Sequence, residues 1–267
     1  MTELHVHERG AGKWIALLIH GGMADHRTRH AVEDHLVGPG HRAPAPGPRG
    51  HGRSPRAEYR PELPAEDRGE NLPAGADVAV GHSLGGPALA LTADRLRPAR
   101  TVYSDPGFLL RNVPVAAYAA MRERATSATA GSVRARNPRS SEEAEGSEGA
   151  EEDVAAELAG LALFDLAFVA AIETCDPDCV PSQAVVPSLV QLAEPSLCVD
   201  DAGAALSRKR GFGIRVVPRT GHCIHRDGLP GFPTSLDGWW GTARPLPRRA
   251  AEPSAYDRHF STSFRFR

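Results

Sequence analysis

The sequence has no excess of charge of either sign, no long apolar run and few cysteines, and each absence argues against a class of protein. It contains 31 basic and 33 acidic side chains, with a formal net charge of −2. The overall charge therefore does not favour nucleic acid or an anionic membrane surface as a partner. We expect a small-molecule partner, with no nucleic acid and no membrane.

No apolar run approaches the roughly 18 residues that a membrane-spanning helix needs. The best candidate, "LAGLALFDLAFVAAI", is interrupted by Asp165. The first residues, "MTELHVHERGAGKW", carry histidines and acidic side chains where a secretory signal has a basic segment and an apolar core. Together these features predict a cytoplasmic protein.

The cysteines do not indicate a disulfide framework or a metal centre. There are four, Cys175, Cys179, Cys198 and Cys223, and in a long chain without a signal we expect reduced thiols. Cys175 and Cys179 form one closely spaced pair with no second matching pair, so we favour a turn over a zinc site. We expect neither a metal nor a cofactor.

Short apolar runs alternate with helical patterns along most of the chain. The runs typical of buried parallel strands are 14–19, 77–80, 100–105, 188–193 and 214–217. Helical patterns cover 86–97 and 200–210, and a further helix is expected to end at Trp240. This alternation predicts an α/β fold, a mostly parallel sheet with helices on both faces. Ligands of such sheets bind at the carboxyl ends of the strands.

One segment, 108–182, breaks this alternation. It is first basic, then acidic through "SEEAEGSEGAEED", and then apolar at steps of three or four from Val154 to Ile172, which is typical of a packed helix. We interpret it as a helical cap inserted between two parts of the core, 1–107 and 183–242. For 134–149 a solvated loop fits as well. The basic, proline-containing tail, 243–267, is expected to be disordered.

A serine lies between glycines directly after a predicted strand. Gly81 to Gly85, "GHSLG", fits G-x-S-x-G between a strand and a helix, the context in which this motif holds a nucleophile on a tight bend. A turn that happens to contain a serine is the competing interpretation. We predict that Ser83 is the nucleophile.

Such a serine needs a base and backbone amides that bind an oxyanion. His222 follows the last predicted strand, so it lies at the same sheet edge as Ser83 and is our candidate base; His225 is expected to pack or hydrogen-bond nearby. A metal held by these two histidines lacks a third ligand. The glycine-rich "HGGM" loop predicts an oxyanion hole from the amide of Gly22 or Met23 together with that of Leu84.

Four motifs in order, "LLIHGG", "GPRGHGRS", "VAVGHSLGG" and "GHCIHRD", resemble those of the α/β-hydrolase fold superfamily over most of the chain outside the insertion and the tail. The resemblance implies an eight-stranded, mostly parallel sheet, a helical cap after the sixth strand, and a Ser-His-acid triad in the chain order serine, acid, histidine. It implies no cofactor.

The acid is the open assignment. The usual position of the superfamily, after the seventh strand, here holds Ser196, and Glu194 is two residues early. The haloalkane dehalogenase branch places its acid after the sixth strand and has an Ala-Glu-Pro sequence similar to residues 193–195, and this similarity points to Asp105. We rank Asp105 before Glu194, and Asp200 third; a turn-starting role is the competing interpretation for Asp105.

The chain departs from the superfamily in "RAPAPGPRGHG", where Gly47 stands in place of the usual aspartate and Pro44, Pro46 and Pro48 predict a weak or edge strand. Pro233 also falls near the start of the C-terminal helix. We expect a serine hydrolase that cleaves an ester or related acyl bond of a small, largely apolar substrate. The alternatives are a carbon-carbon bond hydrolase or acyltransferase with the same triad, or a non-catalytic ligand receptor of this fold.

Overall fold

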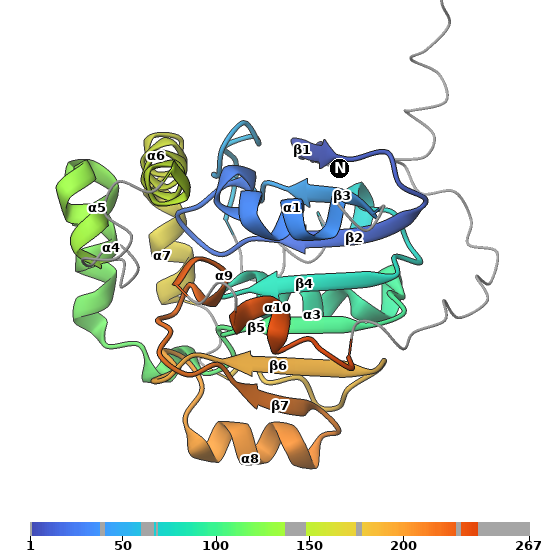
Figure 1. The fold of residues 1–267 in the computed structure, drawn as a ribbon. Helices are drawn as coiled ribbons and strands as arrows, with labels where there is room; N and C mark the ends of the chain where they lie inside the picture. Colours follow the sequence, from blue (N-terminus) through green and yellow to red (C-terminus); the bar gives the residue numbers. More distant parts are fainter. Residues whose placement is uncertain are drawn as a thin grey trace, which may run out of the picture.

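The computed structural model describes residues 2–37, 41–59, 67, 69–136, 148–174, 178–227 and 231–239. Its strands are β1 (Val6–Arg9), β2 (Trp14–Ile19), β3 (His41–Pro46), β4 (Val78–His82), β5 (Thr101–Ser104), β6 (Ser188–Leu192) and β7 (Gly213–Val216). They form one sheet in the order β1-β3-β2-β4-β5-β6-β7 (Figure 1). Only β1 runs antiparallel to its neighbour.

The helices of eight or more residues are α1 (His30–Val37), α3 (Gly85–Leu96), α4 (Val115–Ser127), α6 (Glu148–Ala162) and α8 (Asp201–Lys209). Shorter ones are α5 (Ala130–Arg136), α7 (Ala167–Glu173), α9 (Ile224–Asp227) and α10 (Gly231–Thr234), with 3-10 turns at His26–Arg29 and Leu110–Asn112. Strands and helices therefore alternate along most of the chain, as the sequence predicts.

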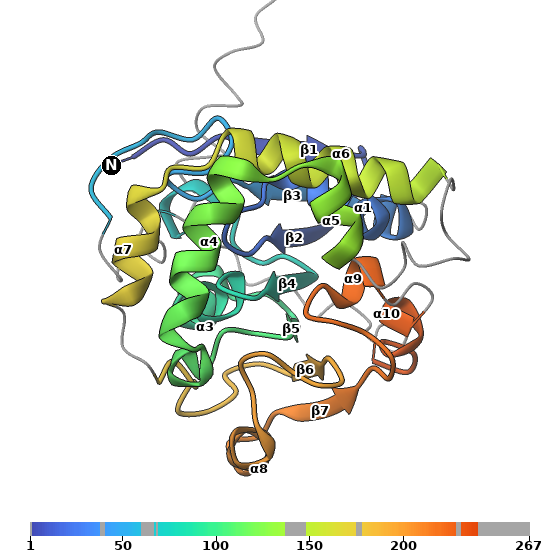
Figure 2. The same ribbon diagram turned by 90° about the vertical axis from the view of Figure 1, so that its left-hand side faces the viewer.

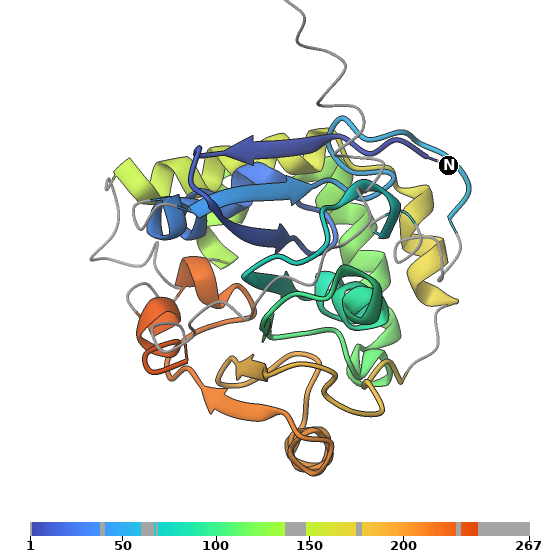
Figure 3. The ribbon, with the colours of Figure 1, turned by 90° about the vertical axis from the view of Figure 1, so that its right-hand side faces the viewer.

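The sheet is apolar on both faces, as a sheet covered by helices on both sides must be. On one face Leu89 and Leu96 of α3 and Ala204 of α8 pack on the strands. On the other face the contacts come from α1, α9 and α10 through Val32, Ile224 and Phe232. Figure 3 shows α3 and α8 on one side of the sheet and α1 and α10 on the other.

The register of the central strands brings distant parts of the sequence to one edge. Ile19 pairs with Gly81 across β2 and β4, and His82 pairs with Ser104 across β4 and β5. Because these strands are parallel, the residues that follow them emerge side by side at the carboxyl edge of the sheet. Ser83 and Asp105 are two of these residues.

The helices α4 to α7, which we call the inserted helices, lie between β5 and β6 in the chain and cover the carboxyl edge of the sheet (Figures 1 and 2). An apolar cluster joins them to the core. It combines Leu161, Phe164 and Phe168 of the inserted segment with Met23 and Leu84 of the sheet-edge loops. This edge is therefore enclosed by apolar side chains.

The apolar stripe from Val154 to Ile172 predicted a single helix, and this was wrong. The structure has two helices, α6 and α7, which meet at about 90°. At the break, the Asp165 side chain accepts hydrogen bonds from the Tyr59 hydroxyl at 2.6 Å and from the Ala167 N–H at 3.0 Å, and its own N–H donates to Gly50 O. The local bond to Ala167 and the two bonds to distant residues replace helical ones at this point, and such a local side-chain bond is common for aspartate.

The proline-containing strand is a true member of the sheet and not its edge. β3 pairs antiparallel with β1 over four residue pairs, including Pro44 with Glu8 and Pro46 with Val6. Toward β2 it pairs only at His41 and Arg42, before the prolines begin. Because proline donates no hydrogen bond, pairing is weak on the β2 side, as one of the two predicted outcomes had it. The other predicted outcome, an edge strand, was wrong.

The predicted α/β fold is confirmed, with seven strands in the described residues instead of eight. The last helix, α10, ends at Thr234, earlier than predicted, and is followed by turns to Trp239. The predicted disordered tail, 243–267, lies outside the described residues, as does Cys175. Within the described parts, no single helix is both long and apolar enough to cross a membrane.

Candidate active site

Ser83 occupies a strained bend between β4 and α3. Its φ of +51° lies in the left-handed region that non-glycine residues rarely adopt. The flanking glycines allow this bend by close approach: a Cβ at Gly81 would lie 2.6 Å from Gly85 O, and one at Gly85 would collide with the Ile19 carbonyl. The bend places the Ser83 hydroxyl above the sheet edge, as the motif predicted.

His222 lies on the loop after β7 with its ring between Ser83 and Asp105. Its Nε2 is 2.9 Å from Ser83 Oγ, and its Nδ1 is 2.6 Å from Asp105 Oδ2. Because an ionised carboxylate only accepts, Nδ1 carries the proton and Nε2 is free to accept from the serine hydroxyl. The three side chains therefore form a continuous hydrogen-bonded chain.

Asp105 is fully buried, and its carboxylate has a donor on each oxygen besides the imidazole. The N–H groups of Ala193 and Leu197 donate to Oδ1 and Oδ2 at 3.2 and 3.3 Å. Its backbone, with φ of +39°, is strained, and its own N–H donates to Gln191 O. These bonds hold the carboxylate in one orientation, which in turn orients the imidazole.

The other two candidate acids lie elsewhere. Glu194 is exposed, and its backbone N–H donates to Thr220 O. Asp200 caps α8 by accepting from the Gly203 N–H at 2.7 Å. The imidazole of His222 donates its hydrogen bond to Asp105 and to neither of these residues.

The glycine-rich loop after β2 packs directly on the serine bend. A Cβ at Gly21 would lie 2.7 Å from Ser83 Cβ, and one at Gly22 would lie 3.0 Å from Leu84 Cδ1. The Met23 N–H donates to His51 Nε2 at 3.1 Å, so it is not available to a ligand. Among the described residues, the N–H groups of Gly22 and Leu84 have no hydrogen-bond partner. Of the two predicted amide pairs, Gly22 with Leu84 remains.

His51 is a residue of this site to which the sequence assigned no role, although it stands in the "GPRGHGRS" motif. It is buried, and its Nδ1–H donates to Arg49 O at 2.9 Å, which leaves Nε2 as the acceptor for Met23. Its ring packs edge-on against Phe164 and Phe168 of the inserted segment, at 4.9 and 4.7 Å. It therefore joins the glycine-rich loop to the inserted helices.

Two buried histidines support the loop of His222. His82 donates from Nε2 to His222 O at 2.9 Å, and His225 lies against the His82 ring and within 2.8 Å of Arg29 Nη1. Burial holds the pKa of both histidines well below 6.5, and the nearby Arg29 guanidinium lowers it further. Both rings are therefore neutral near pH 7. The described residues contain no group of three His, Cys, Asp or Glu side chains that would hold a metal ion.

Comparisons with known proteins bear on the family and the fold of the chain. The sequence profile described as "Alpha/beta hydrolase family" matches residues 16–232. A search of curated proteins found no match.

Among solved structures, the chain is similar to an esterase from Exiguobacterium antarcticum (TM-score 0.66, 17% identity, covering 90% of this chain and 96% of the other). It is also similar to a hydrolase from Oleispira antarctica (TM-score 0.69, 15% identity, 91% and 96%). A third is the N-formylmaleamic acid deformylase from Pseudomonas putida (TM-score 0.68, 20% identity, 88% and 95%). At these identities the likeness shows the fold alone.

Proposed function

Because the chain belongs to the alpha/beta hydrolase family, we propose that it is a serine hydrolase that cleaves an ester or related acyl bond of a small molecule. The observation that supports the proposal is the continuous chain from Ser83 Oγ through His222 to Asp105, with hydrogen bonds of 2.9 and 2.6 Å. A hydroxyl is a poor nucleophile at neutral pH, and this arrangement supplies the base and the group that orients it.

In the proposed reaction, the Ser83 oxygen attacks the carbonyl carbon while its proton moves to His222 Nε2. The N–H groups of Gly22 and Leu84 bind the oxyanion that develops. Protonated His222, stabilised by Asp105, then gives its proton to the leaving group. A water molecule releases the acyl group from Ser83 through the same base, and free enzyme is regenerated without a cofactor.

The apolar part of the substrate is proposed to lie against the cluster that joins the inserted helices to the core. Leu84, adjacent to the nucleophile, belongs to this cluster with Leu110 and Phe164. Apolar side chains around a few polar groups are typical of small-molecule sites. In this proposal, the inserted helices exclude bulk water while the acyl-enzyme forms.

A fluorophosphonate probe tests the proposal directly. The probe is expected to label the folded wild-type protein at Ser83, and Ser83→Ala should abolish the label. Hydrolysis of p-nitrophenyl esters of increasing acyl length then measures how much room the site offers. An unlabelled, folded wild-type protein would contradict the proposal and would favour a ligand receptor of the same fold.

A further inference from the structure

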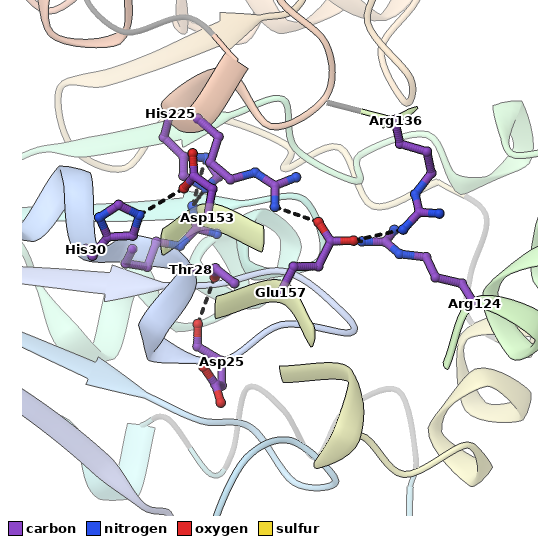
Figure 4. A network of polar contacts seen from close by, with 10 residues as sticks. Asp25, Thr28, His30, Arg124, Arg136, Asp153, Glu157 and His225 are labelled. Atoms are coloured by element: carbon purple, nitrogen blue, oxygen red, sulfur yellow. Dashed lines mark hydrogen bonds and ion pairs between the residues drawn. The ribbon is translucent and has the colours of Figure 1, made fainter. Parts of the chain in front are cut away.

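Three arginines from three elements converge on one glutamate between the inserted helices and the core (Figure 4). Glu157 of α6 accepts through Oε1 from Arg124 of α4 at 2.6 Å and from Arg136 of α5 at 3.0 Å. Through Oε2 it accepts from Arg226 of α9 at 2.6 Å. We call these four residues the arginine cluster.

The arginine cluster has more guanidinium groups than carboxylates, and it is buried at Glu157 and Arg226 but open to solvent at Arg124 and Arg136, whose side chains are 33% and 42% exposed. One carboxylate faces three guanidinium groups, and the side chains of Glu157 and Arg226 are only 5% and 10% exposed. The three arginines keep the pKa of Glu157 below its usual value although burial alone would raise it. Since a guanidinium stays protonated near pH 7, the cluster carries a local charge of about +2.

Among the described residues, Arg124 and Arg136 pair with Glu157 and with no other carboxylate. Buried Arg29 hydrogen-bonds to the His225 ring and not to a carboxylate among the described residues. Asp153 pairs with His30 at 2.8 Å, and burial raises the pKa of Asp227, which lies in the field of Arg226. On the side of α4 and α5, the described residues thus give the cluster two guanidinium groups and one carboxylate.

The arginine cluster borders the proposed active site. Arg124 projects from the face of α4 that also carries Met121 and Ala128, because these positions are three and four residues away. Both of these residues pack in the apolar cluster that contains Leu84. On α6, Leu161 of the same apolar cluster lies four residues after Glu157.

The core side of the cluster is linked to His222 along the chain. Arg226 follows His222 by four residues, on the short helix that continues the His222 loop. Burial raises the pKa of Cys223, the residue next to His222, and the Arg124 guanidinium, although it belongs to an inserted helix, is near enough to oppose this rise. The apolar cluster and the arginine cluster therefore share α4 and α6, and the arginine cluster reaches the helix that follows His222.

The cluster also has hydrogen-bond donors left over. Arg124 uses its Nη2 for Glu157, while its Nε is buried without a partner among the described residues. A buried N–H without an acceptor is costly, and native proteins rarely leave one. A second carboxylate beside Glu157 would accept from this donor, and the planar guanidinium suits such a two-pronged contact.

We propose that the substrate carries a free carboxylate, which binds Arg124 and Arg136 beside Glu157 while its ester group reaches Ser83. The inference rests on the proposed function and narrows it to acid esters with an apolar body. The apolar cluster holds that body, and the arginine cluster selects the charged end. Substrate without the carboxylate leaves Arg124 Nε without an acceptor and binds more weakly.

Two esters of similar length test the inference, the mono-p-nitrophenyl ester of adipic acid and p-nitrophenyl heptanoate. The adipate chain is chosen because it is too long for rapid attack of its own carboxylate on the ester. Wild-type protein is expected to prefer the charged ester. Arg124→Leu and Arg136→Leu should lower kcat/KM for the charged ester about 10- to 100-fold more than for the neutral one, chiefly through KM. Arg124→Lys, which keeps the charge, should restore part of the preference.

The same helices offer matched controls. Arg122 of α4 pairs with Glu173 and Arg134 of α5 pairs with Glu151, each with substantially exposed partners. Arg122→Leu and Arg134→Leu should leave the ratio of the two kcat/KM values as in the wild type. Equal ratios in the wild type and all of these variants would overturn the inference.

A binding measurement separates this inference from the proposed function. The Ser83→Ala variant is titrated with sodium adipate at constant ionic strength, with chloride as the reference, and the shift in Tm is recorded. Adipate is expected to stabilise Ser83→Ala more than the double variant that also carries Arg124→Leu. If neutral esters are hydrolysed but adipate has no effect, the carboxylate inference fails alone. If adipate binds through Arg124 but no ester is cleaved and Ser83 is not labelled, the proposed function fails alone.

Discussion

Asp105 shows how the surroundings of one residue suit it to one task. Its carboxylate is 0% exposed, accepts from two backbone N–H groups and contacts His222 Nδ1 at 2.6 Å. Such a carboxylate holds the imidazole in the tautomer whose Nε2 accepts a proton. Glu194, the other acid near the end of a neighbouring strand, is exposed and has no comparable constraint.

We therefore expect Asp105→Asn to lower kcat for ester hydrolysis about 10⁴-fold, because an amide at this position favours the wrong imidazole tautomer. The matched variant Glu194→Gln should keep kcat within a few-fold of the wild type. Steady-state kinetics with p-nitrophenyl butyrate measure both. A large loss in Glu194→Gln with normal activity in Asp105→Asn would reverse the assignment.

The buried histidines predict a pH dependence of stability. The folded protein keeps His82 and His225 neutral with pKa values well below 6.5, whereas the unfolded chain protonates them as the pH falls through about 6.5. The unfolded state then binds more protons. The free energy of unfolding should therefore fall as the pH decreases below about 6.5, by up to about 1.4 kcal/mol per pH unit for each histidine.

His225→Gln isolates one of these two contributions. Urea unfolding of the wild type and the variant at pH 7.5 and 5.5 should show a smaller loss of stability for the variant at the lower pH. Equal losses for the two proteins would show that His225 does not take up a proton on unfolding in this range.

At the scale of elements, the loop after β2 depends on its neighbours for its shape. Met23 has a φ of +61°, and its N–H is held by His51, which is itself fixed by Arg49 O and by the rings of Phe164 and Phe168. The next amide toward the amino terminus is that of Gly22, the proposed oxyanion donor. The geometry of this donor is thus tied to the loop of His51 and to the inserted segment.

His51→Phe keeps a ring of similar shape but has no acceptor for the Met23 N–H. We expect kcat to fall about 10- to 100-fold with little change in KM, somewhat less than the loss of a whole oxyanion donor causes. His51→Gln, which can still accept a hydrogen bond, should retain more of the wild-type kcat. A change in KM alone would indicate that His51 only shapes the substrate pocket.

At the scale of the whole molecule, buried polar contacts supplement apolar packing in joining the inserted helices to the core. The Glu157–Arg226 pair connects α6 to α9, and the hydrogen bond from His30 to Asp153 connects α1 to α6 (Figure 4). Removing one partner of a buried ion pair leaves the other charge uncompensated and is strongly destabilising. The position of the inserted helices should therefore be sensitive to single substitutions.

We expect Glu157→Ala to lower the free energy of unfolding by about 3 to 5 kcal/mol, because it removes the carboxylate that buried Arg226 shares with two more arginines. The control on the same helix is Glu151→Ala, whose partner Arg134 is exposed and whose loss should cost less than about 1 kcal/mol. Urea unfolding followed by circular dichroism measures both. Similar effects of the two substitutions would mean that the Glu157–Arg226 pair contributes little to holding the inserted helices on the core.

Local sequence alone determined the core strands, the helix after the serine and the strained bend at Ser83. These features depend on short-range physics: apolar runs bury themselves as parallel strands, and small residues permit a tight bend. The position of His222 after the last strand followed from the same reasoning, since parallel strands share a carboxyl edge. The choice of Asp105 needed a resemblance, because no local pattern separates it from Glu194.

Only the tertiary structure decided the rest. It broke the helix at Asp165 through bonds to Tyr59 and Gly50, which are more than a hundred residues away in the chain. It removed the Met23 amide from the candidate oxyanion donors, because this N–H donates to His51. It also gathered three arginines around Glu157, a glutamate that the sequence did not distinguish from its neighbours. Contacts between distant segments depend on the packing of whole elements, so no short stretch of sequence contains them.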